Sequence, residues 1–153
     1  MTAARQLTWF ADHAAEGRPA PPTRALVVRE PYAERIVSGI KTWEMRGRAT
    51  RIRGLIGIIA GGTGTIVGVA TLVDCLGPLD RREYYGGWRQ RGADAPADNP
   101  LPYATTYAWV LADARRATRV VPYHHPSGAV VWVSLSPDAA RAVAAALGDP
   151  AGV

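Results

Sequence analysis

Short apolar runs separated by turn residues make up most of the chain from residue 25 onward. The runs at 25–29, 55–60 and 65–73 are rich in β-branched residues, which is typical of buried strands. Residues 61–64 read Gly-Gly-Thr-Gly, so the second and third runs are predicted to form a hairpin. Three less regular runs are also predicted to be strands: 105–111, 119–123 and 129–135.

Helical periodicity occupies shorter stretches between these runs. Pro31 suits the first position of a helix, and apolar residues recur at helical spacing from there to Gly39, which is a common terminator. A final helix is predicted after Ser136, because a serine hydroxyl can cap the first turn. Weaker patterns predict one helix at 5–17 and a short one near 80–91.

The order of these elements indicates the fold class. Helices do not alternate with strands, as they would in a doubly wound parallel sheet. Five or six short strands with flanking helices favour an α+β domain built on a small β-barrel. Three prolines within residues 18–22 interrupt regular structure before the first strand. We therefore expect residues 1–24 to be an N-terminal extension with a proline-rich linker, and residues 25–153 to form one domain.

The composition limits the binding partners and the cellular compartment that we expect for the protein. The chain has 153 residues and a net charge of +5, which favours anionic partners, nucleic acid above all. Cys75 is the only cysteine, which excludes an internal disulfide, and the adjacent His124 and His125 point opposite ways on an extended chain. We expect no metal and no other cofactor. No apolar run is long enough to span a membrane and no secretory pattern is visible, so a cytoplasmic protein without membrane contact is expected.

The predicted strand at 42–46 carries the most informative side chains. Alternation places Glu44 and Arg46 on one face, with Lys41 just before them. Trp43 and Met45 point to the other face, where we expect Trp43 to pack in the core. Lysine is the cation that can become a catalytic base, and arginine favours bidentate contacts with phosphate or guanine. The three charged groups can hold a phosphate, orient a base or relay a proton, or they form a salt-bridged barrel wall without a ligand.

Residues 39–46, Gly-Ile-Lys-Thr-Trp-Glu-Met-Arg, resemble the signature G-x-K-x-x-E-x-R of the ASCH domain family. Residues 28–33, VREPYA, are similar to the family's opening IRQPWA, and residues 51–54, RIRG, to its RYRG turn. Residues 66–75, IVGVATLVDC, look like its IVGVV…VDC strand. The resemblance covers about residues 25–135 in the same order. It implies a PUA-like β-barrel with a cleft lined by the motif residues.

The resemblance indicates the fold more precisely than the function. ASCH domains are generally inferred to bind RNA or nucleotides, so RNA or a modified nucleotide is the expected partner. Some members hydrolyse the acetyl amide of a modified cytidine and others are described as ribonucleases, so a metal-independent hydrolase is an alternative. Lys41 and Glu44 would then be catalytic. The amidohydrolase-like members carry a threonine nucleophile at the position of Glu44, which a carboxylate replaces poorly. A protein-interaction module is the third class left open.

Further residues extend the expected nucleic-acid site beyond the motif. Four arginines fall within residues 46–53, and phosphate contacts supply most sequence-independent affinity. Tyr32 and Trp109 are candidates for stacking on a base. Glu44 either accepts hydrogen bonds from a base or serves only as a strut for Arg46. The complete expected set is Lys41, Glu44, Arg46, Arg48, Arg51, Arg53, Arg29, Tyr32 and Trp109.

Overall fold

The structure is a computed structural model that describes residues 20–97 and 99–148, so the helix predicted at 5–17 lies outside it. Six strands and three helices follow one another along these residues. Their bounds are β1 (Arg24–Val28), α2 (Tyr32–Val37), β2 (Trp43–Arg46), β3 (Gly54–Ala60), β4 (Thr65–Leu76), α3 (Arg81–Gly86), β5 (Tyr107–Pro122), β6 (Trp132–Ser134) and α4 (Pro137–Ala146).

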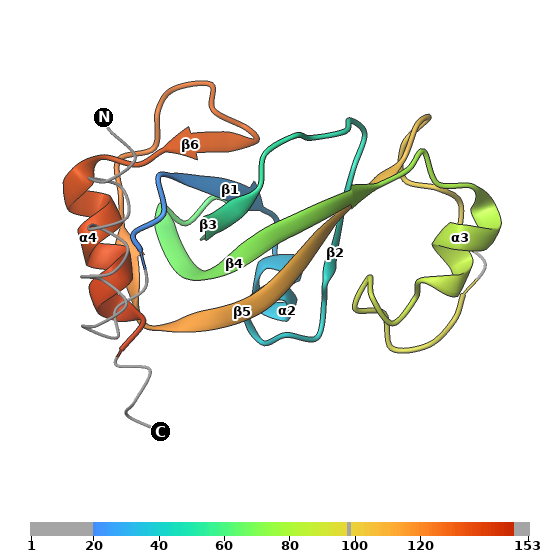
Figure 1. Cartoon of the computed structure of the whole chain (residues 1–153), viewed down its shortest axis with the longest axis horizontal. Coiled ribbons are helices and arrows are strands. Elements are labelled where there is room, and N and C mark those ends of the chain that lie inside the picture. Colours follow the sequence, from blue (N-terminus) through green and yellow to red (C-terminus); the bar gives the residue numbers. More distant parts are fainter. Residues whose placement is uncertain (1–19, 98, 149–153) are drawn as a thin grey trace, which may run out of the picture.

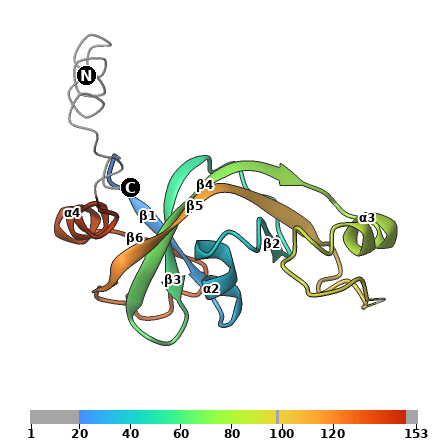
Figure 2. The same cartoon turned by 90° about the horizontal axis from the view of Figure 1, so that it is seen from below.

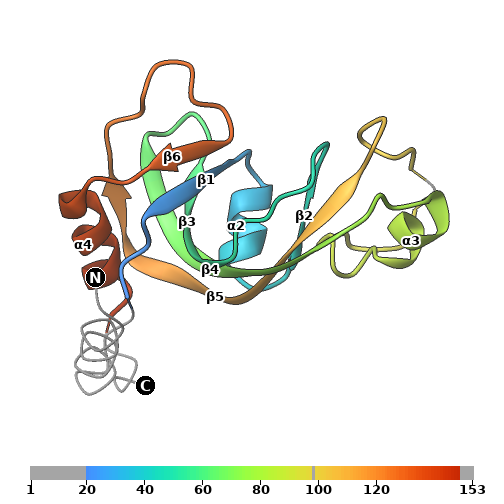
Figure 3. The same cartoon turned by 45° about the horizontal axis from the view of Figure 1, so that its top comes forward.

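The strands form one sheet in the order β2-β5-β4-β3-β1-β6. Strands β1 and β3 are parallel, and every other neighbouring pair is antiparallel. The sheet curls into a half-barrel around α2, with α4 at one end of the molecule and α3 at the other (Figures 1 and 3). The predicted α+β fold built on a small barrel is confirmed. None of the helices in the described residues is long and apolar enough to cross a membrane.

Strand β5 corrects the sequence analysis, which predicts separate strands at 105–111 and 119–123. Polar residues interrupt the apolar pattern between them, yet pairing with β4 continues through this stretch, with Ala112 opposite Thr71 and Arg115 opposite Val69. One additional residue on β5 is accommodated here as a bulge, at Asp113 with φ +52°. The result is a long β4–β5 arm that carries α3 at its end (Figure 2).

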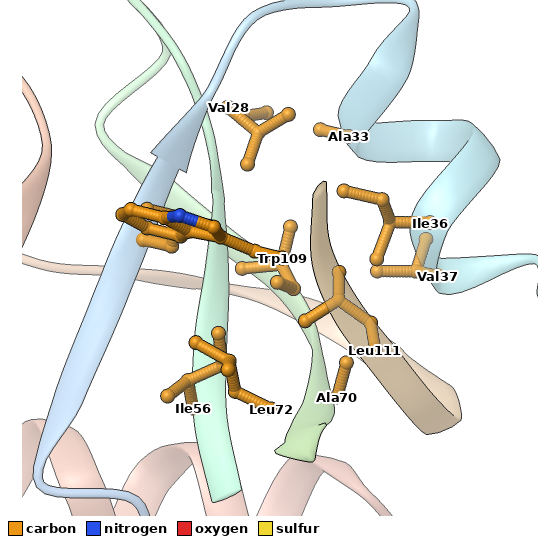
Figure 4. Close-up of a cluster of buried hydrophobic side chains, with 12 residues drawn as sticks. Val28, Ala33, Ile36, Val37, Ile56, Ala70, Leu72, Trp109 and Leu111 are labelled. Carbon is orange, nitrogen blue, oxygen red and sulfur yellow. The ribbon is translucent and has the colours of Figure 1, made fainter. Parts of the chain in front are cut away.

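A hydrophobic core fills the space between α2 and the concave face of the sheet. Ile36 and Val37 of α2 pack against sheet residues that include Leu72 and Leu111 (Figure 4). The helix approaches closely at Gly68 of β4, where an added Cβ would meet the Val37 side chain at 2.8 Å and also overlap the β5 backbone. Glycine at this position therefore allows α2 to seat on the sheet, and α2 in turn supports one wall of the site described below.

A second hydrophobic cluster lies under α4, where Val143 and Leu147 pack on residues such as Val69 and Val133. The Ser136 hydroxyl accepts a hydrogen bond from the backbone N–H of Ala139, which confirms the predicted cap. The short helix expected near 80–91 is present only as Arg81–Gly86. Beyond it, the chain runs without regular structure to β5, and that irregular segment reaches the site.

Candidate functional site

A pocket of about 430 Å³ lies between the strands β1 and β2, the start of α2 and the segment that follows α3. The structure brings five of the sequence-predicted residues to its lining: Arg29, Tyr32, Lys41, Glu44 and Arg46. It adds lining residues that the sequence analysis does not single out: Tyr84, Arg91, Pro102 and Tyr103. The pocket therefore has one wall from the motif and another from Tyr84, Arg91, Pro102 and Tyr103. The chain that follows α3 returns toward β2 (Figure 2).

Lys41 is 4% exposed, and acceptors surround its amine. The Nζ atom donates to the backbone carbonyls of Trp43 at 2.5 Å and Arg91 at 3.2 Å, and it lies 3.8 Å from Glu44 Oε1. An ammonium has three N–H donors and no lone pair, which matches this set of three acceptors. The arrangement suits a fixed cation, and it offers no free lone pair for a general base.

The burial of Lys41 predicts an unusual pH dependence of stability. Burial, assisted by nearby arginines and opposed by Glu44, lowers the pKa of Lys41 from 10.5 to about 8. Above pH 8 the folded protein therefore binds fewer protons than the unfolded chain, so the free energy of unfolding rises with pH. We expect a gain of about 2 kcal/mol between pH 8 and 9.5 from this group.

Urea unfolding of the wild type and of Lys41→Met across this range measures the effect, and the variant should lack the rise. Burial also raises the pKa of Tyr123, which destabilises the fold as pH rises, but only above about pH 10. A wild-type profile that matches Lys41→Met would show that the amine is solvated in the folded protein.

Glu44 is 7% exposed, and its two carboxylate oxygens face the two neighbouring cations. Oε2 accepts a hydrogen bond from Arg46 Nη2 at 2.9 Å, and Oε1 faces Lys41. Arg46 Nη2 also donates to the Val27 carbonyl of β1 at 2.7 Å. Arg46 therefore links the edge strand β2 to β1, across the open side of the half-barrel. This geometry supports a strut role for Glu44 over recognition of a base.

Arg91 is the main site residue that the sequence analysis does not identify. It is 9% exposed, its Nε donates to the Tyr84 carbonyl at 3.0 Å, and its guanidinium lies 3.9 Å from the centroid of the Tyr84 ring. Its own carbonyl accepts from Lys41. No periodic pattern surrounds Arg91 in the sequence, so no local signal distinguishes it from the other arginines.

Backbone contacts fix the Arg91 segment against β2. The Gln90 carbonyl accepts from the N–H groups of Thr42 and Trp43, both at 2.8 Å. The Trp43 ring lies directly over Gly87, where an added Cβ would overlap it. Trp43 is half-buried under this turn and belongs to neither hydrophobic cluster, so the expectation of core packing for Trp43 is wrong. Its side chain instead holds the second wall of the pocket.

Two buried N–H groups of the pocket arginines have no hydrogen-bond partner within the described part of the chain. They are Nε of Arg46 and Nη2 of Arg91. Each unsatisfied buried donor costs about 1–3 kcal/mol, and more where the group is charged. Such exceptions are uncommon in folded proteins and call for an explanation.

Trp109 belongs to the core, which corrects the expectation that it offers a face for stacking. It is 3% exposed, stacks on Trp132 with ring centroids 5.7 Å apart, and donates from Nε1 to the Arg48 carbonyl at 2.8 Å. Figure 4 shows its ring among the apolar side chains. Trp109 is therefore not part of the candidate site.

The loop arginines lie apart from the pocket lining. Arg48 and Arg51 are exposed. Arg53 is exposed too, and its guanidinium donates to the carbonyls of Thr50 at 3.0 Å and Ile52 at 2.8 Å. The loop is thus a separate basic surface beside β2, whereas Tyr32 is an exposed aromatic that does line the pocket.

The curled half-barrel and its cationic pocket define a small domain of the PUA-like class. The chain belongs to the ASCH domain family, whose model matches residues 26–120. Within residues 20–97 and 99–148, no three His, Cys, Asp or Glu side chains come together as a metal site.

Solved structures support the fold. An ASCH protein from Zymomonas mobilis matches with a TM-score of 0.62 at 18% identity, covering 82% of this chain and 96% of the other. A tyrosine-to-phenylalanine mutant of the Zymomonas mobilis protein gives 0.58 at 19% identity, with coverages of 82% and 98%. A serine-to-alanine mutant gives 0.58 at 20%, with 83% and 97%. A comparison with curated proteins gives no match.

Proposed function

We propose that this ASCH domain binds RNA or a nucleotide in the pocket. The observation that carries the proposal is the charge of the lining, which contains four cations, Arg29, Lys41, Arg46 and Arg91, and one carboxylate, Glu44. Such a surface attracts phosphate groups. Two exposed tyrosines, Tyr32 and Tyr103, also line the pocket, and aromatic rings are the usual partners of unstacked bases. The volume of about 430 Å³ lies within the range of ligand sites.

The proposal places the ligand on the pocket side of β2 and the RNA backbone on the loop arginines. It also places the protein in the cytoplasm, where the single Cys75 stays reduced. The hydrolase alternative would need a general base. The Lys41 amine already donates to the carbonyls of Trp43 and Arg91, and with a pKa of about 8 it stays mostly protonated at neutral pH. We therefore propose binding without a chemical step.

The salt dependence of RNA binding tests the proposal. Replacing Arg48, Arg51 and Arg53 together by Ala should weaken micromolar binding to all four homopolymers alike, because these arginines would neutralise backbone phosphates. The slope of log K against log salt should flatten by about 0.7 per lost contact, or about 2 in total. Fluorescence anisotropy at several salt concentrations measures both quantities.

The matched control is Arg141→Ala, which removes an exposed arginine of α4, at one end of the molecule (Figure 1). It should leave the slope unchanged. Equal slopes for the wild type and the triple variant would mean that RNA does not contact the loop. Absence of any salt-dependent RNA or nucleotide binding by the wild type would refute the proposed function.

A further inference from the structure

The charge of the pocket lining indicates which part of a nucleotide enters the pocket, provided that the proposed function holds. Four cations and one carboxylate leave three surplus positive charges in the lining. Both oxygens of Glu44 already face Lys41 and Arg46, so this carboxylate is not free to take a further donor. A nucleobase is neutral and cannot balance the surplus. A terminal phosphate carries a charge of about −1.5 to −2 at pH 7 and three strong acceptor oxygens, so it can offset most of the surplus.

The unpartnered donors point to the same group. Arg46 Nε and Arg91 Nη2 belong to two different walls of one pocket, and neither has an acceptor in the described residues. Arginine forms its strongest hydrogen bonds with carboxylates and phosphates. A phosphate has enough oxygens to accept from both guanidinium groups at once.

Arg91 is buried and held in position, as expected for a residue of a preformed anion-binding site. Its side chain is more than nine-tenths buried, its Nε is held by the Tyr84 carbonyl, and its guanidinium is stacked on the Tyr84 ring. These contacts fix the plane of the guanidinium and leave Nη2 without a partner. Both unpartnered atoms are shielded from solvent, so a phosphate would reach them only after a small shift of each guanidinium within its own plane.

We propose that the pocket binds the terminal phosphate of a nucleotide, free or at an RNA end, between Arg46 and Arg91. The exposed rings of Tyr32 and Tyr103 then receive the base. The second wall, which includes Tyr84, Arg91, Pro102 and Tyr103, bounds the other side of this pocket of about 430 Å³. An internal phosphodiester carries only one charge and two flanking nucleotides, so it matches this strongly cationic pocket less well.

The first test uses the wild-type protein and calorimetric titration at pH 7.5. Adenosine 5′-monophosphate should bind about 10- to 100-fold more tightly than adenosine, which is the range for hydrogen bonds to a charged group. Adenosine 3′-monophosphate and inorganic phosphate establish which phosphate position is accepted. A ten-nucleotide RNA with and without a 5′-phosphate distinguishes an RNA end from a free nucleotide. Equal affinities for the monophosphates and adenosine would overturn the proposal.

The second test compares Arg91→Met with Arg89→Met. Arg89 is an exposed arginine two residues away that lies over Trp88 and is outside the pocket lining. The Arg91 variant should lose about 10- to 100-fold in affinity for the monophosphate and little for adenosine. The Arg89 variant should keep both affinities. Melting curves check folding, and if Arg91→Met does not fold, the wild-type comparison decides the question alone.

The two proposals fail in different ways. If 5′-hydroxyl RNA binds with salt dependence and a terminal phosphate does not increase the affinity, this inference is wrong and the proposed function is still supported. If neither RNA nor any nucleotide binds, both are wrong. Tight binding of the monophosphate without RNA binding would keep the inference and restrict the function to free nucleotides.

Discussion

Glu44→Gln is expected to lower the free energy of unfolding by about 3–5 kcal/mol, because it leaves the buried Lys41 and the partly buried Arg46 without their counter-charge. The substitution keeps the size of the side chain and one acceptor for Arg46, so the loss comes mainly from the charge. For a domain of this size it corresponds to a fall in melting temperature of roughly 10 °C. Nucleotide preference should change little, because the carboxylate oxygens face Lys41 and Arg46.

Glu34→Gln is the matched control. Glu34 forms a bidentate ion pair with Arg116, but both side chains are about half exposed. Exposed ion pairs contribute little to stability, so its melting temperature should stay close to that of the wild type. An unchanged melting temperature for Glu44→Gln, together with an altered preference among the four homopolymers, would show instead that Glu44 reads a base.

Trp109→Ala should destabilise the protein by about 3–5 kcal/mol, the usual cost of removing a large buried aromatic side chain. The variant loses the stack on Trp132 and the hydrogen bond to the Arg48 carbonyl, and it opens a cavity in the core. Trp88→Ala provides the comparison, because Trp88 is only half-buried beside α3 and belongs to neither hydrophobic cluster. It should cost clearly less.

Chemical denaturation gives both free energies, and RNA binding measured well below the melting temperature separates stability from recognition. We expect folded Trp109→Phe to bind RNA as the wild type does. A Trp109→Ala protein with wild-type stability and weakened RNA binding would contradict the placement of this ring in the core.

Alternation along residues 42–46 predicts part of the first wall of the site, although Met45, which it assigns to the other face, also lines the pocket. It places Glu44 and Arg46 on one face because a strand turns successive side chains to opposite sides. The same rule fails for Trp43, because it says only which face a side chain takes. What covers that face is the turn around Gly87, more than 40 residues later in the chain.

The second wall could not be predicted, because contacts with residues far away in the sequence hold it in place. The segment around Gln90 and Arg91 has no apolar period, and it is held by hydrogen bonds from Thr42 and Trp43 to the Gln90 carbonyl and from the Lys41 amine to the Arg91 carbonyl. The sequence does not show whether Trp109 packs in the core or faces the pocket, for another reason. A curled sheet has one concave face that serves both the core and the pocket, and alternation does not separate the two uses.

The hydrogen bond from Arg46 to the Val27 carbonyl has a mechanical consequence. It joins β2 to β1, although β5, β4 and β3 lie between these two strands in the sheet. The bond therefore helps to hold the half-barrel in its curled shape. A planar guanidinium cannot turn toward a ligand without altering its other bonds. If a phosphate binds there as proposed, occupancy of the pocket and closure of the sheet are linked equilibria, and each shifts the other by the same free energy.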